Sequence, residues 1–127
     1  HYPLRRQRQM CIRDRNFTSN MHTQKNNLNK FRAKIFKALS DPVRLEIIQY
    51  LYEGEKCVCE IIPHVGIIQP LVSRHLKILK ECGLVKERRE GNRRLYSITD
   101  PRIFDLIEWV TPELANVLSR HIIEQIV

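Results

Sequence analysis

The pattern of apolar and polar residues predicts helices over the first periodic part of the chain. Apolar residues recur there at helical spacing, with lysines on the opposite face: Leu28, Phe31, Ile35 and Leu39. They predict an amphipathic helix from about Asn27 to Leu39, whose apolar face needs a packing partner. Ser40-Asp41-Pro42 then supplies a capping side chain and a proline at the first helical position, so a second helix begins there and ends at Gly54.

Two further periodic segments follow each other closely. Val58, Ile61, Ile62 and Val65 predict a helix of about two turns that ends between Pro63 and Gly66. Pro70 opens a longer helix that ends at Gly83, and basic residues occupy much of its exposed face. Two short helices joined by a few residues that include a glycine are typical of a helix-turn-helix motif. This motif is the first indication of function.

After Gly83 the apolar spacing changes from helical to alternating. Residues 84–88 and 94–98 predict two strands, and the turn formers Gly91 and Asn92 lie between them. Arginines at positions 88, 89, 93 and 94 surround the tip of this hairpin. A basic hairpin directly after a helix-turn-helix is interpreted as a wing.

The last segment is strongly apolar and is divided by Thr111-Pro112, which predicts a helix restart. Its apolar residues form stripes at helical spacing: Ile103, Leu106, Ile107, Val110, Leu114, Val117, Leu118, Ile122 and Ile126. A terminal helix of this kind must bury its apolar face, and a second copy of the same helix is a natural partner. The predicted fold is therefore mainly α with a small β-hairpin wing, a winged helix-turn-helix that dimerises through terminal helices.

Length and composition fit one small globular domain, with 127 residues, 43% hydrophobic and 28% charged. The sequence has no apolar run of about 18 residues and no signal-peptide pattern, so we expect no membrane partner and a cytoplasmic location. No phosphate-binding loop, pair of catalytic carboxylates, or nucleophile with a base and an orienting group can be assembled from the motifs. The sequence therefore predicts that the protein is not an enzyme.

The net charge of +8 is unevenly distributed. Residues 1–20 contain five arginines and one aspartate, residues 69–99 contain eight basic and three acidic residues, and residues 100–127 have a net charge of −3. The first stretch is similar to translated adapter sequence, so residues 1–20 are interpreted as a disordered or non-native leader, with Met21 as the start; a genuine basic arm is the alternative. Residues 21–127 then form the winged helix-turn-helix domain, with a dimerisation helix over about 101–127.

The basic patch predicts contacts with double-stranded DNA. Gln69 and Arg74 have the donor and acceptor geometry for base edges, whereas Ser73, His75 and Lys77 suit phosphates or bases. Arg93 and Arg94 are predicted to hold the DNA backbone or minor groove from the wing. A packing role for His75 stays open, because it falls on the inward repeat of its helix. The alternatives for the patch are a solvated surface or a winged-helix module used for protein association.

Cys57 and Cys59 form a close pair in a chain with too few cysteines for a disulfide scaffold, which suggests metal or redox chemistry. On a regular helix their side chains would lie about 200° apart, so both can face one ion only at a distorted first turn. Soft thiolates select thiophilic ions, which makes As(III), Sb(III), Cd, Pb or Zn the candidates. A small apolar filler is the alternative role for the pair.

Four motifs carry a resemblance to a known family. Residues 37–45 (KALSDPVRL), 57–60 (CVCE), 72–79 (VSRHLKIL) and 83–85 (GLV) resemble the ArsR/SmtB family of arsenical-resistance repressors, over roughly residues 30–98. The resemblance implies a homodimeric winged-helix repressor that sits on operator DNA and releases it when a metal or metalloid binds. It implies no obligatory cofactor, with Cys57 and Cys59 as ligands of the inducer ion and arsenite as the favoured ion.

The sequence departs from the family pattern in three places. Ile62 stands where arsenic sensors often have a third cysteine, so a third donor would come from Cys82, His64, Glu60, solvent or the other subunit; Cys82 is interpreted first as a structural thiol. Ile68 and Leu71 replace hydroxyl residues beside Gln69, which affects the operator sequence. His121 and Glu124 match half of the family's second zinc motif, but Val110 replaces a histidine, so no zinc is expected there. The alternative function is a winged-helix regulator without metal sensing, triggered by a thiol oxidant or by no small molecule.

Overall fold

The structure is a computed structural model that describes the backbone of residues 15–126 and the side chains of residues 24–126. The chain divides into two units, residues 1–37 and residues 38–127. The described part of the first unit is helix α2, Arg15–Ala38, which begins well before the predicted start at Asn27. No proline or glycine interrupts this segment, so the helix can extend beyond its apolar stripe. Of the predicted leader, residues 15–20 belong to α2, and residues 1–14 lie outside the described residues.

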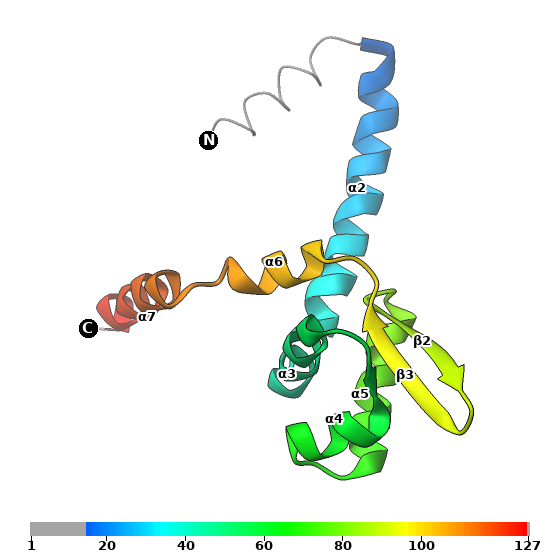
Figure 1. Ribbon diagram of the computed structural model, residues 1–127. Coiled ribbons are helices and arrows are strands. Elements are labelled where there is room, and N and C mark those ends of the chain that lie inside the picture. Colours follow the sequence, from blue (N-terminus) through cyan, green and yellow to red (C-terminus); the bar gives the residue numbers. More distant parts are fainter. Residues whose placement is uncertain (1–14, 127) are drawn as a thin grey trace. The chain divides into compact units, whose positions relative to one another are not determined.

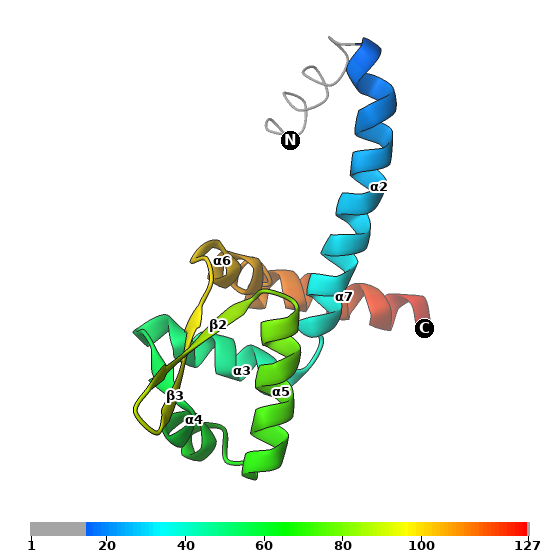
Figure 2. The same ribbon diagram turned by 90° about the vertical axis from the view of Figure 1, so that its right-hand side faces the viewer.

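The second unit has the predicted winged helix-turn-helix architecture, which Figures 1 and 2 show from two sides. Its elements in chain order are α3 (Pro42–Tyr50), η1 (Leu51–Glu53), β1 (Lys56–Cys57), α4 (Val58–Val65), α5 (Gln69–Glu81), β2 (Val85–Glu90), β3 (Arg93–Ile98), α6 (Arg102–Glu108) and α7 (Pro112–Ile126). Helices α4 and α5 form the helix-turn-helix, and β2 and β3 form the wing. The predicted ends of these elements differ from the observed ends by only a few residues.

Helix α3 begins as the Ser40-Asp41-Pro42 motif predicts. The Asp41 carboxylate accepts hydrogen bonds from the backbone N–H groups of Val43 (2.8 Å) and Arg44 (3.3 Å), and Pro42 occupies the first turn. Burial acts to raise the pKa of Asp41, but these donors and the nearby positive charge of Arg44 outweigh burial and lower the pKa. The cap therefore stays charged at neutral pH.

The hydrophobic core lies between α3, α4, α5 and the base of the wing. Its fully buried side chains come from the three helices and the turn after α3: Ile47, Ile48, Leu51, Ile61, Val72, Leu76 and Leu79. Further buried side chains are those of Leu84, which precedes β2, and of the sheet residues Val85, Leu95 and Tyr96, each less than 9% exposed. Burying each large apolar side chain stabilises the fold by about 1.5–3 kcal/mol. This core fixes α5 against the rest of the domain. As the second helix of the helix-turn-helix, α5 is called the recognition helix below.

The hairpin of β2 and β3 is part of a three-stranded antiparallel sheet with the order β1-β3-β2, whereas the sequence predicts only the hairpin. Strand β1 pairs with β3 through Lys56↔Tyr96 and Cys57↔Leu95. A strand of two residues is too short to produce an alternating pattern, so nothing in the sequence indicated it. Strands β2 and β3 pair from Val85↔Ile98 to Glu90↔Arg93, and Gly91 takes the positive φ of 62° that this tight turn requires. Cys57 is thus part of the same sheet as the wing.

A polar cluster connects the wing to the recognition helix. The hydroxyl of Tyr96 on β3 donates a hydrogen bond to the carboxylate of Glu87 on β2. Lys80 of α5 lies 3.6 Å from one Glu87 oxygen, and Arg94 lies 3.9 Å from the other. Burial, reinforced by the hydrogen bond and the charge of Glu87, raises the pKa of Tyr96 to about 12. The same hydrogen bond, helped by Lys80 and Arg94, lowers the pKa of Glu87.

This cluster predicts a stability difference that depends on alkaline pH. The folded-state pKa of Tyr96 lies above its unfolded value of 10.0. The contribution of the Tyr96 hydroxyl to the free energy of unfolding is therefore complete below pH 10.0 and is lost as the pH rises toward about 12. The Tyr96→Phe variant should be less stable by about 1.5–3 kcal/mol at neutral pH, as expected for a hydrogen bond to a charged group. Denaturant unfolding of both proteins should show this gap closing between pH 10 and 12. A gap of constant size, or one as large for the exposed control Tyr52→Phe, would contradict the assignment.

The C-terminal segment is helical on both sides of the predicted break. The Thr111 hydroxyl caps α7 by accepting a hydrogen bond of 3.1 Å from the Leu114 N–H. All described α7 side chains are exposed, and many of them are large and apolar: Leu114, Val117, Leu118, Ile122, Ile123 and Ile126. Helix α2 also exposes apolar residues, namely Leu28, Phe31 and Phe36. Exposed apolar surface of this extent marks an interaction surface rather than a solvated one.

Candidate DNA-binding surface and cysteine site

The helix-turn-helix presents α5 with a polar outer face. Gly66 ends α4 in the left-handed conformation (φ 72°), and α5 begins at Gln69 after a turn of a few residues. Val72, Leu76 and Leu79 point into the core, while Gln69, Arg74 and Lys77 are exposed and Ser73 is half-buried. Ile68 occupies the N-cap position and makes no side-chain cap, in agreement with the missing hydroxyl noted in the sequence. The predicted DNA-contacting residues of α5, apart from His75, therefore lie on its outer side or at its edge.

His75 takes a different position from the rest of that set. Its ring is half-buried, and its Nδ1 lies 3.3 Å from the Arg44 guanidinium. Arg44 also donates a hydrogen bond from Nε to the carbonyl oxygen of Ala38. Because a guanidinium has only donors, His75 Nδ1 acts here as the acceptor. This contact favours the packing role that the sequence left open. Sequence reasoning missed Arg44, although it stands in the motif at residues 37–45.

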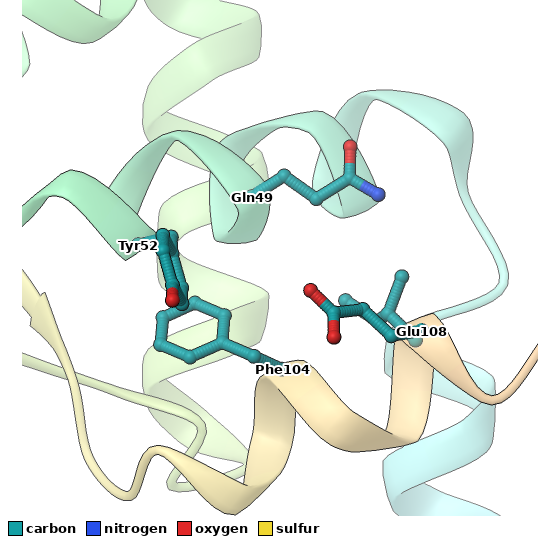
Figure 3. A pocket seen from close by; sticks show the side chains of 5 residues that line it. Gln49, Tyr52, Phe104 and Glu108 are labelled. Carbon is teal, nitrogen blue, oxygen red and sulfur yellow. The ribbon is translucent and has the colours of Figure 1, made fainter.

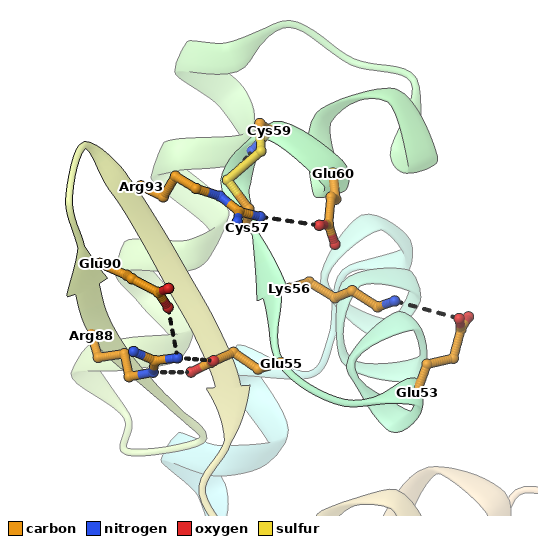
Figure 4. Close-up of polar contacts among 9 residues, drawn as sticks. All are labelled: Glu53, Glu55, Lys56, Cys57, Cys59, Glu60, Arg88, Glu90 and Arg93. Carbon is orange, nitrogen blue, oxygen red and sulfur yellow. Dashed lines mark hydrogen bonds and ion pairs between the residues drawn. A yellow bond between two sulfur atoms is a disulfide. The ribbon is translucent and has the colours of Figure 1, made fainter.

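Three of the wing's four arginines are engaged with carboxylates, as Figure 4 shows for Arg88 and Arg93. Arg88 makes two hydrogen bonds of 2.7 Å to Glu55 and one of 3.1 Å to Glu90. The hydrogen bonds and charge of Glu55 raise the pKa of Arg88, and Arg88 lowers the pKa of Glu55. Exposed Arg93 lies 3.3 Å from Glu60 of α4, and half-buried Arg94 lies near Glu87. Acidic residues of the same chain therefore balance part of the wing's positive charge.

Cys57 and Cys59 come together because Cys57 lies just outside α4. Cys57 is the N-cap residue, with extended backbone angles (φ −72°, ψ 149°), and Cys59 is in the first turn. The Cys59 N–H donates to the Cys57 sulfur at 3.1 Å, and the two sulfurs form a disulfide with a Cα–Cα distance of 5.1 Å (Figure 4). Cys57 is buried and Cys59 is exposed. The helical constraint of about 200° does not apply to a residue before the helix.

Among the described residues, two sulfur donors lie together at this site, and no third metal-binding side chain joins them. No cluster of three or more His, Cys, Asp or Glu side chains suited to a metal ion occurs among them. Cys82 is half-buried at the end of α5, His64 stacks on Tyr50 (centroids 3.7 Å apart), and Glu60 pairs with Arg93. His121 lies 3.0 Å from the Gln125 amide within α7. The reduced pair fits a thiophilic ion as two of its ligands, with the remaining ones left to solvent or a second subunit.

A small cavity lies apart from these motifs, between the end of α3 and α6 (Figure 3). It has a volume of about 220 Å³ and is lined by Gln49, Tyr52, Phe104, Ile107 and Glu108. Tyr52 and Phe104 pack edge to face with centroids 5.0 Å apart. The lining has one carboxylate and no nucleophile with a base, so it does not offer the groups that a catalytic site needs.

Comparison with known proteins decides the family. A family model described as "Bacterial regulatory protein, arsR family" matches residues 41–87. The solution structure of the homodimeric winged helix-turn-helix DNA-binding domain Mb0332 from Mycobacterium bovis, titled a possible ArsR-family regulator, is 37% identical, with a TM-score of 0.63, over 68% of this chain and 82% of that chain. The chain belongs to the ArsR/SmtB family. It is a DNA-binding transcriptional regulator, and the family is not one of enzymes.

Two curated relatives of this ArsR/SmtB protein are named for resistance to soft ions. A probable mercury resistance operon repressor of Streptomyces lividans is 47% identical over 75 residues, which cover 59% of this chain and 60% of that protein. An arsenical resistance operon repressor of Staphylococcus xylosus is 44% identical over 66 residues, which cover 52% and 64%. The matches thus span less than two thirds of either relative. In residues 15–126 of the ArsR/SmtB protein, no helix has an apolar stretch long enough to span a bilayer.

Proposed function

We propose that this ArsR/SmtB protein is a homodimeric repressor that releases operator DNA when a thiophilic ion binds Cys57 and Cys59. The observation that carries the proposal is the meeting of the two sulfurs at the N-terminus of α4, the first helix of the helix-turn-helix. A change in the backbone at this point acts on the element that packs against the recognition helix. The names of the mercury and arsenical relatives support a soft ion as the inducer.

The chemistry of the site favours thiolate ligands for such an ion. The partial positive charge at a helix N-terminus stabilises a nearby thiolate, which is the form of cysteine that binds metal ions. Paired thiolates select As(III), Sb(III), Cd, Pb or Zn over hard cations, and arsenite is the inducer we test first. The disulfide must be reduced before the sulfurs can coordinate an ion. An ion would then reach the two sulfurs from the side of Cys59, because Cys59 is exposed and Cys57 is buried.

The DNA contacts are assigned by position on α5 and the wing. Gln69 and Arg74 approach base edges in the major groove, and Ser73 and Lys77 contact phosphates or bases. Arg93 and Arg94 reach the backbone or minor groove from the wing. His75 would contact DNA only through the accessible part of its ring, because its Nδ1 is beside Arg44.

Dimerisation through the terminal helices follows from the exposed apolar faces of α2 and α7. The related Mb0332 domain is described as homodimeric, and two recognition helices in a dimer would contact half-sites about 34–36 Å apart. Each subunit then reads one half-site. An inducer acts by changing the distance or tilt between the two recognition helices.

A salt titration tests the phosphate contact that we assign to Lys77. The Lys77→Ala variant should bind duplex DNA more weakly at every sequence, and its plot of log K against log salt should be shallower by about one. The control Arg102→Ala removes a positive charge on α6, outside the helix-turn-helix and wing, and should leave the slope unchanged. Equal slopes for Lys77→Ala and the wild type would remove Lys77 from the interface.

Ion-driven release tests the sensor proposal directly. Reduced protein bound to a duplex carrying its operator is titrated with arsenite, Hg²⁺, Cd²⁺ and Zn²⁺, and with Mg²⁺ as the control, and release is followed by fluorescence anisotropy. We expect release by at least one of the thiophilic ions and none by Mg²⁺. Protein that stays on DNA with all four ions would refute metal sensing by this chain.

The disulfide favours a second candidate, a thiol-redox trigger at the same residues. In this case the two thiols lose two protons and two electrons to a peroxide, which is reduced to water or an alcohol and water, and a sulfur–sulfur bond forms. Peroxide would then release the operator without any ion, and dithiothreitol would restore binding. Release by peroxide together with no release by ions under reducing conditions would favour this candidate over metal sensing.

A further inference from the structure

Two glutamates flank the cysteine pair, and each holds an arginine of the wing (Figure 4). Glu55 precedes β1 and binds Arg88 of β2 through two hydrogen bonds of 2.7 Å. Glu60 follows Cys59 and lies 3.3 Å from Arg93, at the start of β3. Between the glutamates, β1 pairs with β3 through Lys56 and Cys57. The segment that carries the cysteines is therefore attached to the wing on both sides of the sulfurs.

The two attachments differ in how they depend on the cysteines. Glu55 directly precedes β1, and the backbone pairing of β1 with β3 holds Glu55 in place independently of α4. Glu60 is the third residue of α4, so its position follows the backbone of the first turn, which Cys59 shares. In the structure the two sulfurs are linked, and the Glu60 carboxylate lies beside Arg93. Of the two glutamates, Glu60 is thus the one that shares the first turn of α4 with Cys59.

The contact of Glu60 with Arg93 competes with DNA. A guanidinium paired with a carboxylate on its own protein is less available to a phosphate, and the carboxylate itself repels the polyanion. The pair is half-exposed, with side-chain accessibilities of 53% for Arg93 and 42% for Glu60, so it adds little to stability and is broken easily. A contact of this kind changes DNA affinity without determining the fold.

We propose that Glu60 is a positioning residue that withdraws Arg93 from DNA when Cys57 and Cys59 are linked, either by an ion or as a disulfide. When the link opens, the first turn of α4 is free to relax, and Arg93 can turn to a phosphate. The inference deepens the proposed function, since it rests on Cys57 and Cys59 as the sensor and assigns the step between the sulfurs and the wing.

The test uses protein linked by glutathione disulfide, which takes up two protons and two electrons from Cys57 and Cys59 and becomes two molecules of glutathione. Peptide mass mapping verifies the linkage. In this form Glu60→Gln should bind the operator duplex roughly 2- to 30-fold more tightly than the wild type, the range for residues that couple two sites. Its salt dependence should be steeper by about one, because Arg93 then contacts a phosphate. A purely structural role of Glu60 would not produce the steeper slope.

Two controls make the outcome decisive. Glu55→Gln breaks the matched ion pair to Arg88 and should not change the difference in affinity between the linked and reduced forms. In an Arg93→Gln background, Glu60→Gln should have no further effect on affinity or slope. The proposal would be overturned if the two glutamate variants changed the difference in affinity between the linked and reduced forms equally. It would also be overturned if Glu60→Gln still changed the affinity in the Arg93→Gln background. Failure of the wild type to respond to ions would instead refute metal sensing, because the comparison in the disulfide form needs no ion.

Discussion

Replacing either sensor cysteine with serine is expected to leave operator binding intact and to abolish release by arsenite. Serine is close in size to cysteine, and at position 57 it is a favoured N-cap, so Cys57→Ser should retain the start of α4. A hydroxyl is a hard donor and does not replace a thiolate toward a soft ion. Inducer binding in the wild type should lower operator affinity by about 5- to 150-fold, the usual range for coupled sites.

In Cys57→Ser and Cys59→Ser, we expect the affinities with and without arsenite to agree within about twofold, well below the coupling range. Anisotropy of a labelled operator duplex under reducing conditions measures both. Cys82→Ser is the matched control, because its sulfur is half-buried at the end of α5 and forms no link to the pair. Control protein should release DNA like the wild type. Full release by both single variants would reject Cys57 and Cys59 as the sensor.

Truncating Leu76 to alanine should destabilise the domain more than any surface change. Leu76 is fully buried on the inner face of the recognition helix, so Leu76→Ala leaves a cavity in the core and should cost about 2–5 kcal/mol in unfolding free energy. Its neighbour Lys77 is exposed, and Lys77→Ala should change stability by no more than about 0.5 kcal/mol. Comparing the two variants separates core packing from DNA contact, because Lys77→Ala is expected to weaken DNA binding and not to unfold the domain.

Urea unfolding of the two variants and the wild type at one protein concentration measures these differences. A fixed concentration is needed because dimerisation adds to the apparent stability. If Leu76→Ala unfolded with the same midpoint as the wild type, α5 would not be anchored by this side chain, and the core described above would be incorrect at its centre.

Local sequence signals predicted most of the second unit. The apolar spacing at Val58 and Ile61 indicated α4, and Gly91 placed the turn of the wing, because both signals depend on residues near each other in the chain. The start of α2 was wrong, since an apolar stripe does not limit a helix when no breaker precedes it. Strand β1 was missed because it exists only through its pairing with β3, some 38 residues later.

The cysteine site shows the same division between local and distant information. The sequence identified Cys57 and Cys59 and restricted them to a helix start, where their sulfurs do meet. The ion pairs from Glu55 and Glu60 to the wing join residues 33 positions apart, and no periodicity or motif reports such a contact. The same holds for Arg44 and His75, whose contact depends on how α3 packs against α5.

The capping of α4 by a sulfur has a consequence for how such a regulator could be rewired. Thiols are not among the favoured capping groups, so α4 has a weakly capped first turn at the position where, in the proposed mechanism, the inducer ion binds. A carboxylate in that place, as in Cys57→Asp, would hold the turn firmly and offer no soft ligand. A cell with that allele should stay silent at the controlled genes even under toxic exposure. In the proposed mechanism, sensitivity to a soft ion and a strongly capped helix start therefore exclude each other at position 57, where this chain has cysteine.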